Sequence, residues 1–435
     1  MDIILGIISQ IIRVFNLFWW IVLPIVVFFI FWEFWIMFSR NRFVESIKWV
    51  MLEINIPQNI EKTPKAMEQV FTEMIATYSF GFNSIGKYIE GRVESWLSFE
   101  MVGYNGGVYF YAYIPSKFRN LFESAIYAQY SEAEINEVED YTQVLASTLP
   151  NSVYDLWGTE LILSKDSCYP IRTYHYFEDT KEEKRIDPIS AIAEVMSNLK
   201  EGEMIWLSFL ISPTGAPSGN NWQEKGKEVI AEITGREIKK TKGSAGSTLS
   251  DWLRNVSMAP IEGPTWGVGA KEEKTENFKF LHPGETEAVK EIGNKISKFG
   301  FETIIRFIYI DKKESFSSAN VSAIFGSFQQ FNTQHLNSLK PNSKMSTLKM
   351  GWLPKIFPKY KQWVEFSRKR TLFEYYRQRR FGIYNRVKEE KFSVFTPEEL
   401  ATLYHFPITS VEAPHLRRIE TKRGGPPSGL PIDNS

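Results

Sequence analysis

The sequence of 435 residues contains a single cysteine, Cys168, and only five histidines. One cysteine excludes an intramolecular disulfide framework and a zinc cluster of the usual kind, and it suits a reducing compartment. None of the histidines stands three or four residues from another histidine or from the cysteine, as common metal ligands do. The sequence therefore predicts no metal site.

Motifs of nucleotide hydrolysis and of nucleophilic catalysis are missing as well. A phosphate-binding loop needs glycines at fixed spacing, followed by lysine and then serine or threonine. The nearest string, from Gly263 to Lys271, has the wrong spacing, continues with Glu272 and follows no predicted strand. No Gly-x-Ser-x-Gly nucleophile motif stands between a strand and a helix. We therefore expect no enzymatic activity and no cofactor.

One long apolar run stands out near the N-terminus. From Leu17 to Phe38, Glu33 is the only charged residue. About 20 apolar residues are enough to cross a hydrocarbon core of roughly 30 Å. We therefore predict a single transmembrane helix over residues 17–39, preceded by an interfacial segment over residues 1–16.

The charges that flank this run predict its orientation. Arg40, Arg42 and Lys48 follow it, whereas Arg13, offset by Asp2, precedes it. Because basic residues are retained on the cytoplasmic side, the body after the helix is predicted to be cytoplasmic. The expected location is the cell (inner) membrane, with a single pass through the lipid bilayer.

The soluble body is predicted to be α+β. Residues 49–142 follow the order strand, helix, strand, strand, helix, strand, with a hairpin turn from Tyr104 to Gly107. This order is typical of a ferredoxin-like sandwich. Residues 154–338 predict a second such unit, interrupted by an insertion over 239–279 that is rich in Gly, Ser, Lys and Glu. We see no residue-level repeat between the two units.

Two strands of the second unit have a composition of their own. Met204–Ile211 and Ile304–Ile310 are nearly continuous apolar runs. Runs of this kind are typical of strands that are buried on both faces of a sheet.

A basic, aromatic-rich helical segment is predicted over residues 339–395. The protein as a whole is neutral, with 51 basic and 51 acidic residues, yet residues 351–391 hold twelve Lys and Arg against four Glu. Three hypotheses stay open for this tract: docking on an acidic partner, contact with DNA phosphates, or contact with anionic lipid. The candidate residues for nucleic-acid or anionic-surface binding are Arg368, Lys369, Arg370, Arg377, Arg379 and Arg380.

The C-terminal segment, residues 396–435, begins with a helix start and ends in a Pro/Gly-rich tail. Thr396, Pro397 and Glu399 have the spacing of a capping box with proline in the first turn. The tail has the composition of an extended linker.

Several strings carry a resemblance to known proteins. They are Lys62-Thr-Pro-Lys-Ala-Met-Glu-Gln69, Arg119-Asn-Leu-Phe-Glu-Ser-Ala-Ile-Tyr-Ala-Gln-Tyr130, Gln329-Gln-Phe-Asn-Thr-Gln334 and Thr396-Pro-Glu-Glu-Leu-Ala-Thr-Leu-Tyr-His-Phe-Pro407. Together they resemble uncharacterised single-span membrane proteins of candidate-phylum bacteria. Those are similar to the N-terminal, non-motor region of coupling-type ATPases of type IV secretion and conjugation. The sequence contains no motor. This fits either a P-loop translocation ATPase on a separate chain, which we expect as the partner, or a chain cut short before its motor.

The resemblance implies a non-enzymatic, membrane-anchored scaffold or adaptor for that ATPase. The residues expected to contact the partner are Leu400, Tyr404, His405, Phe406 and Pro407. An alternative for these five is that they pack the end of the second unit. An alternative for the whole protein is a membrane-tethered ligand-binding or sensory module, and a homo-oligomer is possible in either case.

Overall fold

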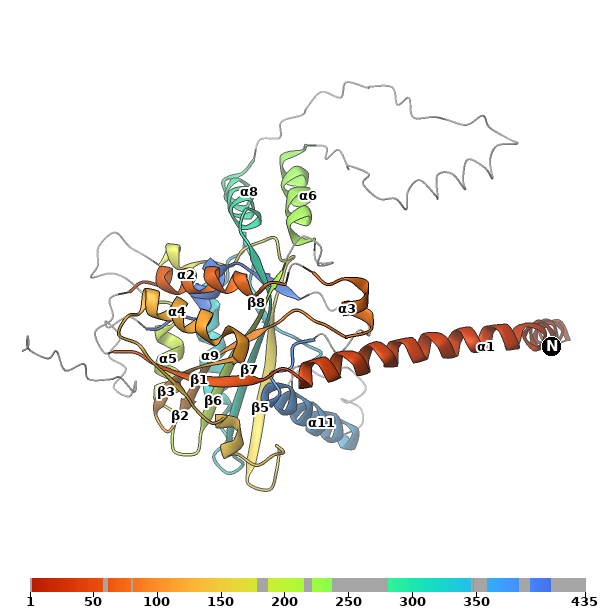
Figure 1. Cartoon of the computed structure of the whole chain (residues 1–435), viewed down its shortest axis with the longest axis horizontal. Coiled ribbons are helices and arrows are strands. Elements are labelled where there is room, and N and C mark those ends of the chain that lie inside the picture. The colour runs from red at the N-terminus through yellow and green to blue at the C-terminus, as the bar shows by residue number, and fades with distance from the viewer. Residues whose placement is uncertain are drawn as a thin grey trace, which may run out of the picture.

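One large antiparallel sheet with helices on both faces forms the body of the protein (Figure 1). The computed structural model describes residues 2–57, 62–79, 81–177, 187–214, 221–236, 281–345, 347, 358–382 and 392–407. The predicted insertion over 239–279 and the Pro/Gly tail after residue 407 lie outside the described residues, as do parts of the basic segment. The predicted mixed α+β class is confirmed.

Nine strands make up the sheet among the described residues, in the order β4-β1-β3-β2-β6-β7-β5-β8, with β9 pairing with β7. All of these pairs are antiparallel. The strands are β1 (Trp49–Asn55), β2 (Leu97–Tyr104), β3 (Gly107–Pro115), β4 (Glu134–Glu137), β5 (Tyr154–Leu163), β6 (Met204–Thr214), β7 (Gly300–Lys312), β8 (Leu339–Pro341) and β9 (Ser393–Phe395).

The two halves of the sheet have the same strand order, reflected about its centre. The first half runs β4-β1-β3-β2 and the second runs β8-β5-β7-β6 when read from its outer edge. The halves meet where β2 pairs with β6, from Leu97 opposite Ile211 to Tyr104 opposite Met204. The two units that the sequence predicts therefore share one continuous sheet.

Each half carries two helices in equivalent places along the chain. The first half has α2 (Pro64–Met74) after β1 and α4 (Arg119–Gln129) after β3, and the second has α5 (Ser190–Ser197) after β5 and α9 (Ser318–Phe328) after β7. Short 3-10 helices lie in the connections: η1 (Ile75–Thr77), η2 (Ser116–Phe118), η3 (Tyr141–Val144), η4 (Tyr174–Tyr176) and η6 (Gln329–Phe331).

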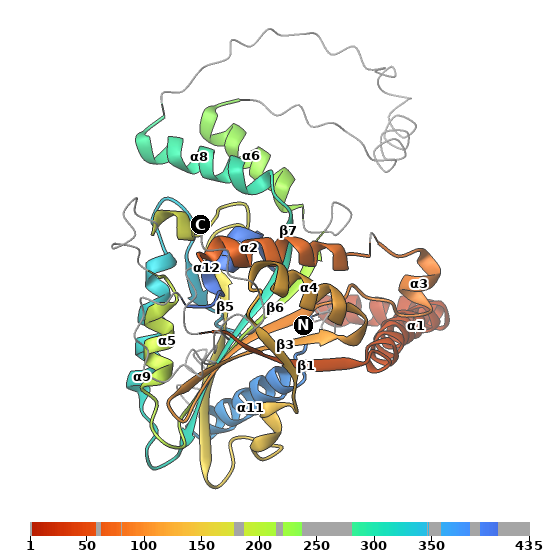
Figure 2. The same cartoon turned by 60° about the vertical axis from the view of Figure 1, so that its left-hand side comes forward.

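Both faces of the central strands are covered. In β2, Phe99 packs against Phe71 of α2, whereas its neighbour Glu100 contacts the segment after α11 (Pro358–Arg377) on the other face. Residues Met204 to Pro213 of β6 are all buried, and so is Ile304–Ile310 of β7. The prediction of strands buried on both faces is confirmed. Figures 1 and 2 show α2 and α4 on one side of the sheet and α11 on the other.

A pair of helices extends beyond the end of the sheet between β6 and β7. These are α6 (Trp222–Thr234) and α8 (Pro283–Ile296), which stand at the top of Figures 1 and 2. Apolar side chains at their base, including Val229 and Ile292, form a small core with Cys168. In the first half, the corresponding connection is a tight turn in which Asn105 and Gly106 both have positive φ, as the predicted hairpin requires.

The N-terminal helix α1 runs without interruption from Asp2 to Glu45. Residues 2–16, predicted as a separate interfacial segment, are thus helical in continuity with the apolar run. One stretch among the described residues, Val22–Glu45, is long and apolar enough to cross a membrane. Most apolar side chains from Trp19 to Phe38 are exposed, so the body does not cover them.

A short connection holds the C-terminal end of α1 against the body. In α3 (Ser84–Tyr88), the carbonyl of Tyr88 accepts a hydrogen bond from Nε1 of Trp35 at 3.0 Å. Gly91, with a φ of +68°, lies against the backbone of Ser39, where an added Cβ would be 2.3 Å from the carbonyl. A side chain at this position would therefore push the helix away from the body.

The C-terminal segment fills the centre of the core. Here α12 (Pro397–Leu403) begins with the predicted capping box between Thr396 and Glu399, which is confirmed. The ring of Tyr404 then packs against Phe99 of β2 and Phe209 of β6, the two strands that join the halves. Residues 393–406 are thus a part of the fold and bridge both halves of the sheet.

Two substitutions of Tyr404 should separate the contribution of its ring from that of its hydroxyl. The hydroxyl is buried and has no hydrogen-bond partner among the described residues. Tyr404→Phe should raise the free energy of unfolding by about 1 kcal/mol, because an unsatisfied polar group is removed. Tyr404→Ala should lower it by about 3–5 kcal/mol, because a large cavity forms.

Urea unfolding of the detergent-solubilised full-length protein, followed by tryptophan fluorescence, measures both effects. A phenylalanine variant less stable than the wild type would show that the hydroxyl is satisfied, and would contradict the prediction.

Candidate functional site

Helix α11 lies across the sheet face opposite α2 and α12, and its second half is anchored there by aromatic contacts. Phe373 and Tyr376 pack on Trp206 of β6, with ring centroids 6.1 and 5.4 Å apart. Leu372 is fully buried beside Gly158 of β5. This face therefore holds the described part of the basic tract that the sequence singles out.

Arg379, just past the end of α11, forms a buried ion pair with Glu100 of β2. Its Nε lies 3.0 Å from Oε1 and its Nη2 lies 3.2 Å from Oε2, a bidentate arrangement. The same guanidinium contacts a second carboxylate, Asp140, with Nη2 to Oδ1 at 2.9 Å. Arg379 and Glu100 are 1% and 0% exposed. Charges this deeply buried persist only when their hydrogen bonds are satisfied.

Neighbouring hydroxyls complete the network around Glu100. Tyr141 donates to Oε2 and Ser98 donates to Oε1, each at 2.6 Å, and the Tyr141 and Tyr376 hydroxyls lie 2.9 Å apart. Burial alone lowers the pKa of Arg379, but the nearby carboxylate of Glu100 outweighs it and holds the pKa well above its usual value. Arg379 is therefore a permanent cation that ties the end of α11 to the sheet.

The backbone at Arg379 is strained, and its contacts explain why it stays so. Its φ is +44°, a left-handed conformation in which glycine is the usual residue. The amides of Arg379 and Arg380 bond to the carbonyls of Tyr376 and Tyr375, which is the Schellman pattern of a helix end. Nε1 of Trp96 donates to the Arg379 carbonyl at 3.0 Å. With both side chain and carbonyl held, the surroundings impose the strain.

The other candidate basic residues differ in their accessibility. Lys369 is buried and reaches both oxygens of Asp155 at 2.9 Å. Arg377 is half-buried and donates to the backbone carbonyl of Ser147 at 2.8 Å. Of the six candidates, Arg368 and Arg380 are also half-buried, and Arg370 is exposed. The number of Lys and Arg residues in the tract thus overstates the number of accessible cations. Contact of the six candidate residues with nucleic acid or an anionic surface stays a prediction.

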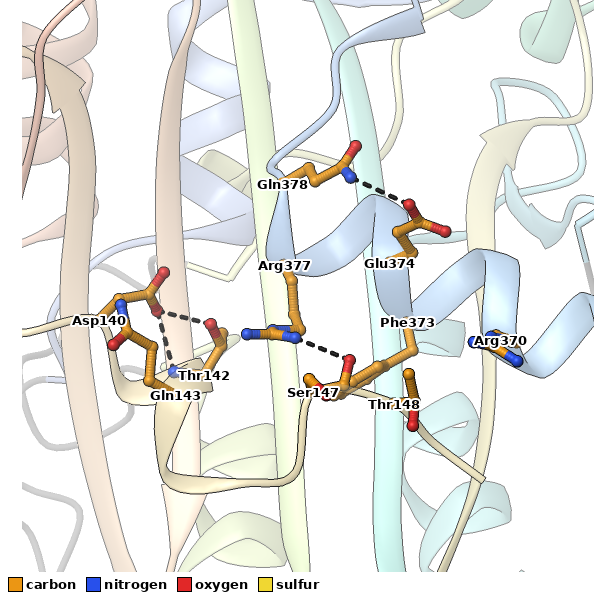
Figure 3. Close-up of a pocket in the computed structure, with 10 residues that line it drawn as sticks. All are labelled: Asp140, Thr142, Gln143, Ser147, Thr148, Arg370, Phe373, Glu374, Arg377 and Gln378. Carbon is orange, nitrogen blue, oxygen red and sulfur yellow. Dashed lines mark hydrogen bonds between the residues drawn. The ribbon is translucent and has the colours of Figure 1, made fainter. Parts of the chain in front are cut away.

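A cavity of about 430 Å³ opens between η3 with the loop that follows it and the second half of α11 (Figure 3). Both signs of charge line it. The lining residues are Asp140, Thr142, Gln143, Ser147, Thr148, Arg370, Phe373, Glu374, Arg377 and Gln378. Such a lining suits a small polar ligand or peptide side chains better than an apolar compound.

No group of three or more His, Cys, Asp or Glu residues that could hold a metal ion occurs in the part of the chain that the structure describes. Burial raises the pKa of the Cys168 thiol, so this cysteine is protonated at neutral pH. Cys168 is also not among the residues that line the cavity.

The predicted partner-contact residues lie in the core. Leu400, Tyr404, His405 and Phe406 are buried, and Pro407 is half-buried. This placement corresponds to the alternative interpretation, in which the segment packs the end of the body. Partner contact by these residues stays a prediction, and it would need side chains that this structure places inside.

A buried ion pair and a buried hydrogen bond hold the C-terminal segment in place. Nζ of Lys295 in α8 lies 2.9 Å from Oε2 of Glu399, and both side chains are 1% exposed. Nε2 of His405 lies 2.9 Å from Oδ1 of Asp187. Burial lowers the pKa of Lys295 although Glu399 opposes the shift. The segment is thus tied to α8 and to the chain before α5.

The sequence interpretation did not single out Glu100, Asp140, Lys295 or Asp187. A signal existed for Glu100, which stands between Phe99 and Met101 in a strand of apolar residues. A carboxylate in such a place needs a buried cation. The identity of that cation is not encoded locally, because Arg379 lies 279 positions along the chain.

No protein-family model matches the chain, and no curated protein matches it. Function is therefore inferred from the contacts described above and from the resemblance carried by the motifs.

Replacing Arg379 should destabilise the protein strongly. Arg379→Ala leaves Glu100 charged and unpaired in the core, so the free energy of unfolding should fall by about 3–5 kcal/mol. Arg379→Lys should rescue only a part of this loss, because an ammonium cannot form the bidentate contact. Denaturant unfolding measures both.

The matched control is Arg370→Ala in α11. Its side chain is exposed, so the change should be within about 0.5 kcal/mol of the wild type. Equal stability of the Arg379→Ala and Arg370→Ala variants would contradict a structural role for the buried pair.

Asp140 should make the protein sensitive to acid. Burial raises the pKa of Asp140, but its hydrogen bonds with Arg379 outweigh this and leave the pKa below its ordinary value. A depressed folded-state pKa adds stability above the unfolded pKa of about 3.9, and this contribution is lost as the pH falls through the folded pKa. Asp140→Asn should therefore be less stable than wild type at pH 7, and the gap should narrow below about pH 4.

Urea unfolding of wild type and Asp140→Asn across this pH range tests the expectation. A gap that stays constant down to the acid limit would show that the carboxylate carries no such linkage.

Proposed function

We propose that this protein is a non-enzymatic, membrane-anchored scaffold or adaptor that holds a P-loop translocation ATPase, of the DNA-transfer or type IV secretion type, at the membrane. The observation that carries the proposal is the path of the chain. It begins as an apolar helix fixed to the body and ends, among the described residues, with a segment buried at the centre of the core. A partner attached to that segment would be coupled to the anchor through one rigid sheet.

The anchor supports this function because α1 is joined firmly to the body. The contacts of Tyr88 with Trp35 and of Gly91 with Ser39 hold the end of the helix. A scaffold needs such a joint, because a flexible tether would leave the position of its partner undefined. We infer from the flanking charges that the helix spans the cell (inner) membrane with the body in the cytoplasm.

We also propose that each half of the body is a ferredoxin-like unit. Within each half, strand order and the two helices after its first and third strands agree with the split βαβ arrangement. The two units would be joined through the edge strands β2 and β6. Joining them in this way leaves β4 and β8 as the outer edges of the sheet.

The position of the C-terminal segment supports an ATPase-holding role. Figure 2 shows α12 beside α2, on the opposite side of the sheet from α11. A partner held close to Pro407 would therefore dock on the side of α2 and α12. The type of partner rests on the resemblance of the motifs, above all the string from Thr396 to Pro407.

A ligand-binding or sensory module is the second candidate. The cavity beside α11 favours this candidate. Its volume of about 430 Å³ and its lining of both positive and negative side chains can receive a small polar molecule.

Affinity purification from native membranes in mild detergent tests the scaffold. The tagged full-length protein should recover a P-loop ATPase identified by mass spectrometry, and deletion of residues 408–435 should lose it. This deletion spares Leu400 and Tyr404, which the core needs. A longer deletion would remove buried residues of the core, so a loss of the ATPase could reflect unfolding of the protein and not loss of the docking segment.

The control is Val153→Ala, a change of an exposed side chain outside the candidate sites, which should retain the ATPase. Equal recovery with and without residues 408–435 would refute docking through the tail. Recovery of the protein alone would favour the ligand-binding module.

A further inference from the structure

Exposed apolar side chains gather on the side of the body from which α1 leaves. In and just after α3, Ile85 and Ile89 are 58% and 60% exposed, and at the start of α11 Tyr360, Trp363 and Phe366 are 45%, 63% and 47% exposed. Figure 1 shows α3 and α11 on the same side of the sheet as α1. Clustered apolar side chains of this size indicate a contact surface.

The level of α3 along α1 is set by direct contacts. Tyr88 accepts the hydrogen bond of Trp35 and its ring lies 5.8 Å from that of Trp32. Trp35 lies about 5 Å before Phe38, the end of the apolar run, at 1.5 Å of rise per residue. Interfacial helices bury their apolar face to about 5–10 Å. The two isoleucines of this segment therefore lie at the level where acyl chains begin.

The first turns of α11 carry a different chemistry. Lys359 and Lys361 are exposed and flank Tyr360, whose ring stacks on that of Trp363 at 6.0 Å. Indole and phenol rings favour the headgroup level of a bilayer, and lysines are attracted to anionic headgroups. This end of α11 matches a lipid headgroup surface in both respects.

Ion pairs inside the fold leave fewer cations of the tract accessible to nucleic acid, and this favours lipid as the partner of this surface. Lys369 and Arg379 are neutralised by Asp155 and Glu100 inside the fold. Binding to DNA phosphates scales with the number of accessible cations. The exposed side chains of Ile85 and Ile89 would also find no apolar surface to contact on a phosphate backbone.

We propose that α3 and the first turns of α11 rest on the surface of an anionic bilayer, with Ile85 and Ile89 among the acyl chains and Trp363 at the headgroups. The proposal rests on the membrane anchoring of α1 in the proposed function. It adds that the body is held with its α11 face toward the membrane.

Site-directed spin labelling of the full-length protein tests this orientation. In a Cys168→Ala background, single cysteines replace Phe29 in α1, Ile89, Trp363, and Tyr127 in α4 on the other face. All four native side chains are exposed, so the labels disturb no core. Collisions with oxygen, which concentrates in bilayers, are compared with collisions with a water-soluble nickel chelate in vesicles of phosphatidylcholine with phosphatidylglycerol.

Labels at 29 and 89 should favour oxygen, the label at 363 should give a ratio between those of 89 and 127, and the label at 127 should favour nickel. In phosphatidylcholine alone, position 363 should shift toward nickel while position 89 stays with oxygen. If positions 89 and 363 match 127 while 29 favours oxygen, the anchor stands and the proposal fails. If 29 also matches 127, the anchor itself is refuted and the proposal with it. Protection of position 363 by added duplex DNA, without protection by vesicles, would assign the surface to nucleic acid and overturn the proposal.

Discussion

Pairing of β2 with β6 joins two four-stranded halves into one sheet, and the rest of the fold covers the two faces that this pairing creates. Strands at the middle of so wide a sheet have no contact with water, so each face needs an apolar layer. Tyr404 supplies the centre of one layer by packing over both central strands. Trp206 supplies the centre of the other, under Phe373 and Tyr376. Both layers include side chains from residue 358 onward, which makes residues 358–382 and 392–407 inseparable from the sheet.

Buried polar pairs then fix how these late segments are positioned. Two are ion pairs, Arg379 with Glu100 and Lys295 with Glu399, and the third is the hydrogen bond of His405 with Asp187. Each joins residues at least about a hundred positions apart. Apolar packing tolerates sliding by a fraction of a turn, whereas a bidentate ion pair in the core accepts one geometry. The left-handed backbone at Arg379 shows that this geometry is imposed against a local preference. These pairs specify the register of α11 and α12 more than they add to stability.

Local patterns in the sequence identify much of the fold. The alternation and apolar runs of the strands, the Asn105-Gly106 turn and the capping box at Thr396 all depend on neighbouring residues, and each has its predicted place. The joining of the halves does not follow from such patterns, because the composition of an apolar strand does not show which strand it pairs with.

The candidate site shows the same limit. The end of an apolar helix can have the same composition whether it contacts a partner or packs in the core of its own chain. The sequence therefore leaves the role of Tyr404 and Phe406 open, and the structure shows that both are buried. A tract of basic residues likewise counts charges without showing that Lys369 and Arg379 are already paired.

The central place of Tyr404 has a consequence for how the protein is made. A ribosome adds roughly 5–20 residues per second, so α1 emerges and can enter the membrane well before residue 404 exists. For roughly 20–70 s at that rate of elongation, Phe71 and Phe99 lack the covering ring of Tyr404. The edge of β2 waits about 5–20 s for β6. On the proposed anchoring of α1, the nascent body would be tethered to the bilayer while its core is still open. Its biogenesis would then call for a chaperone or a slow, membrane-side maturation step that ends only when the last segment closes the fold.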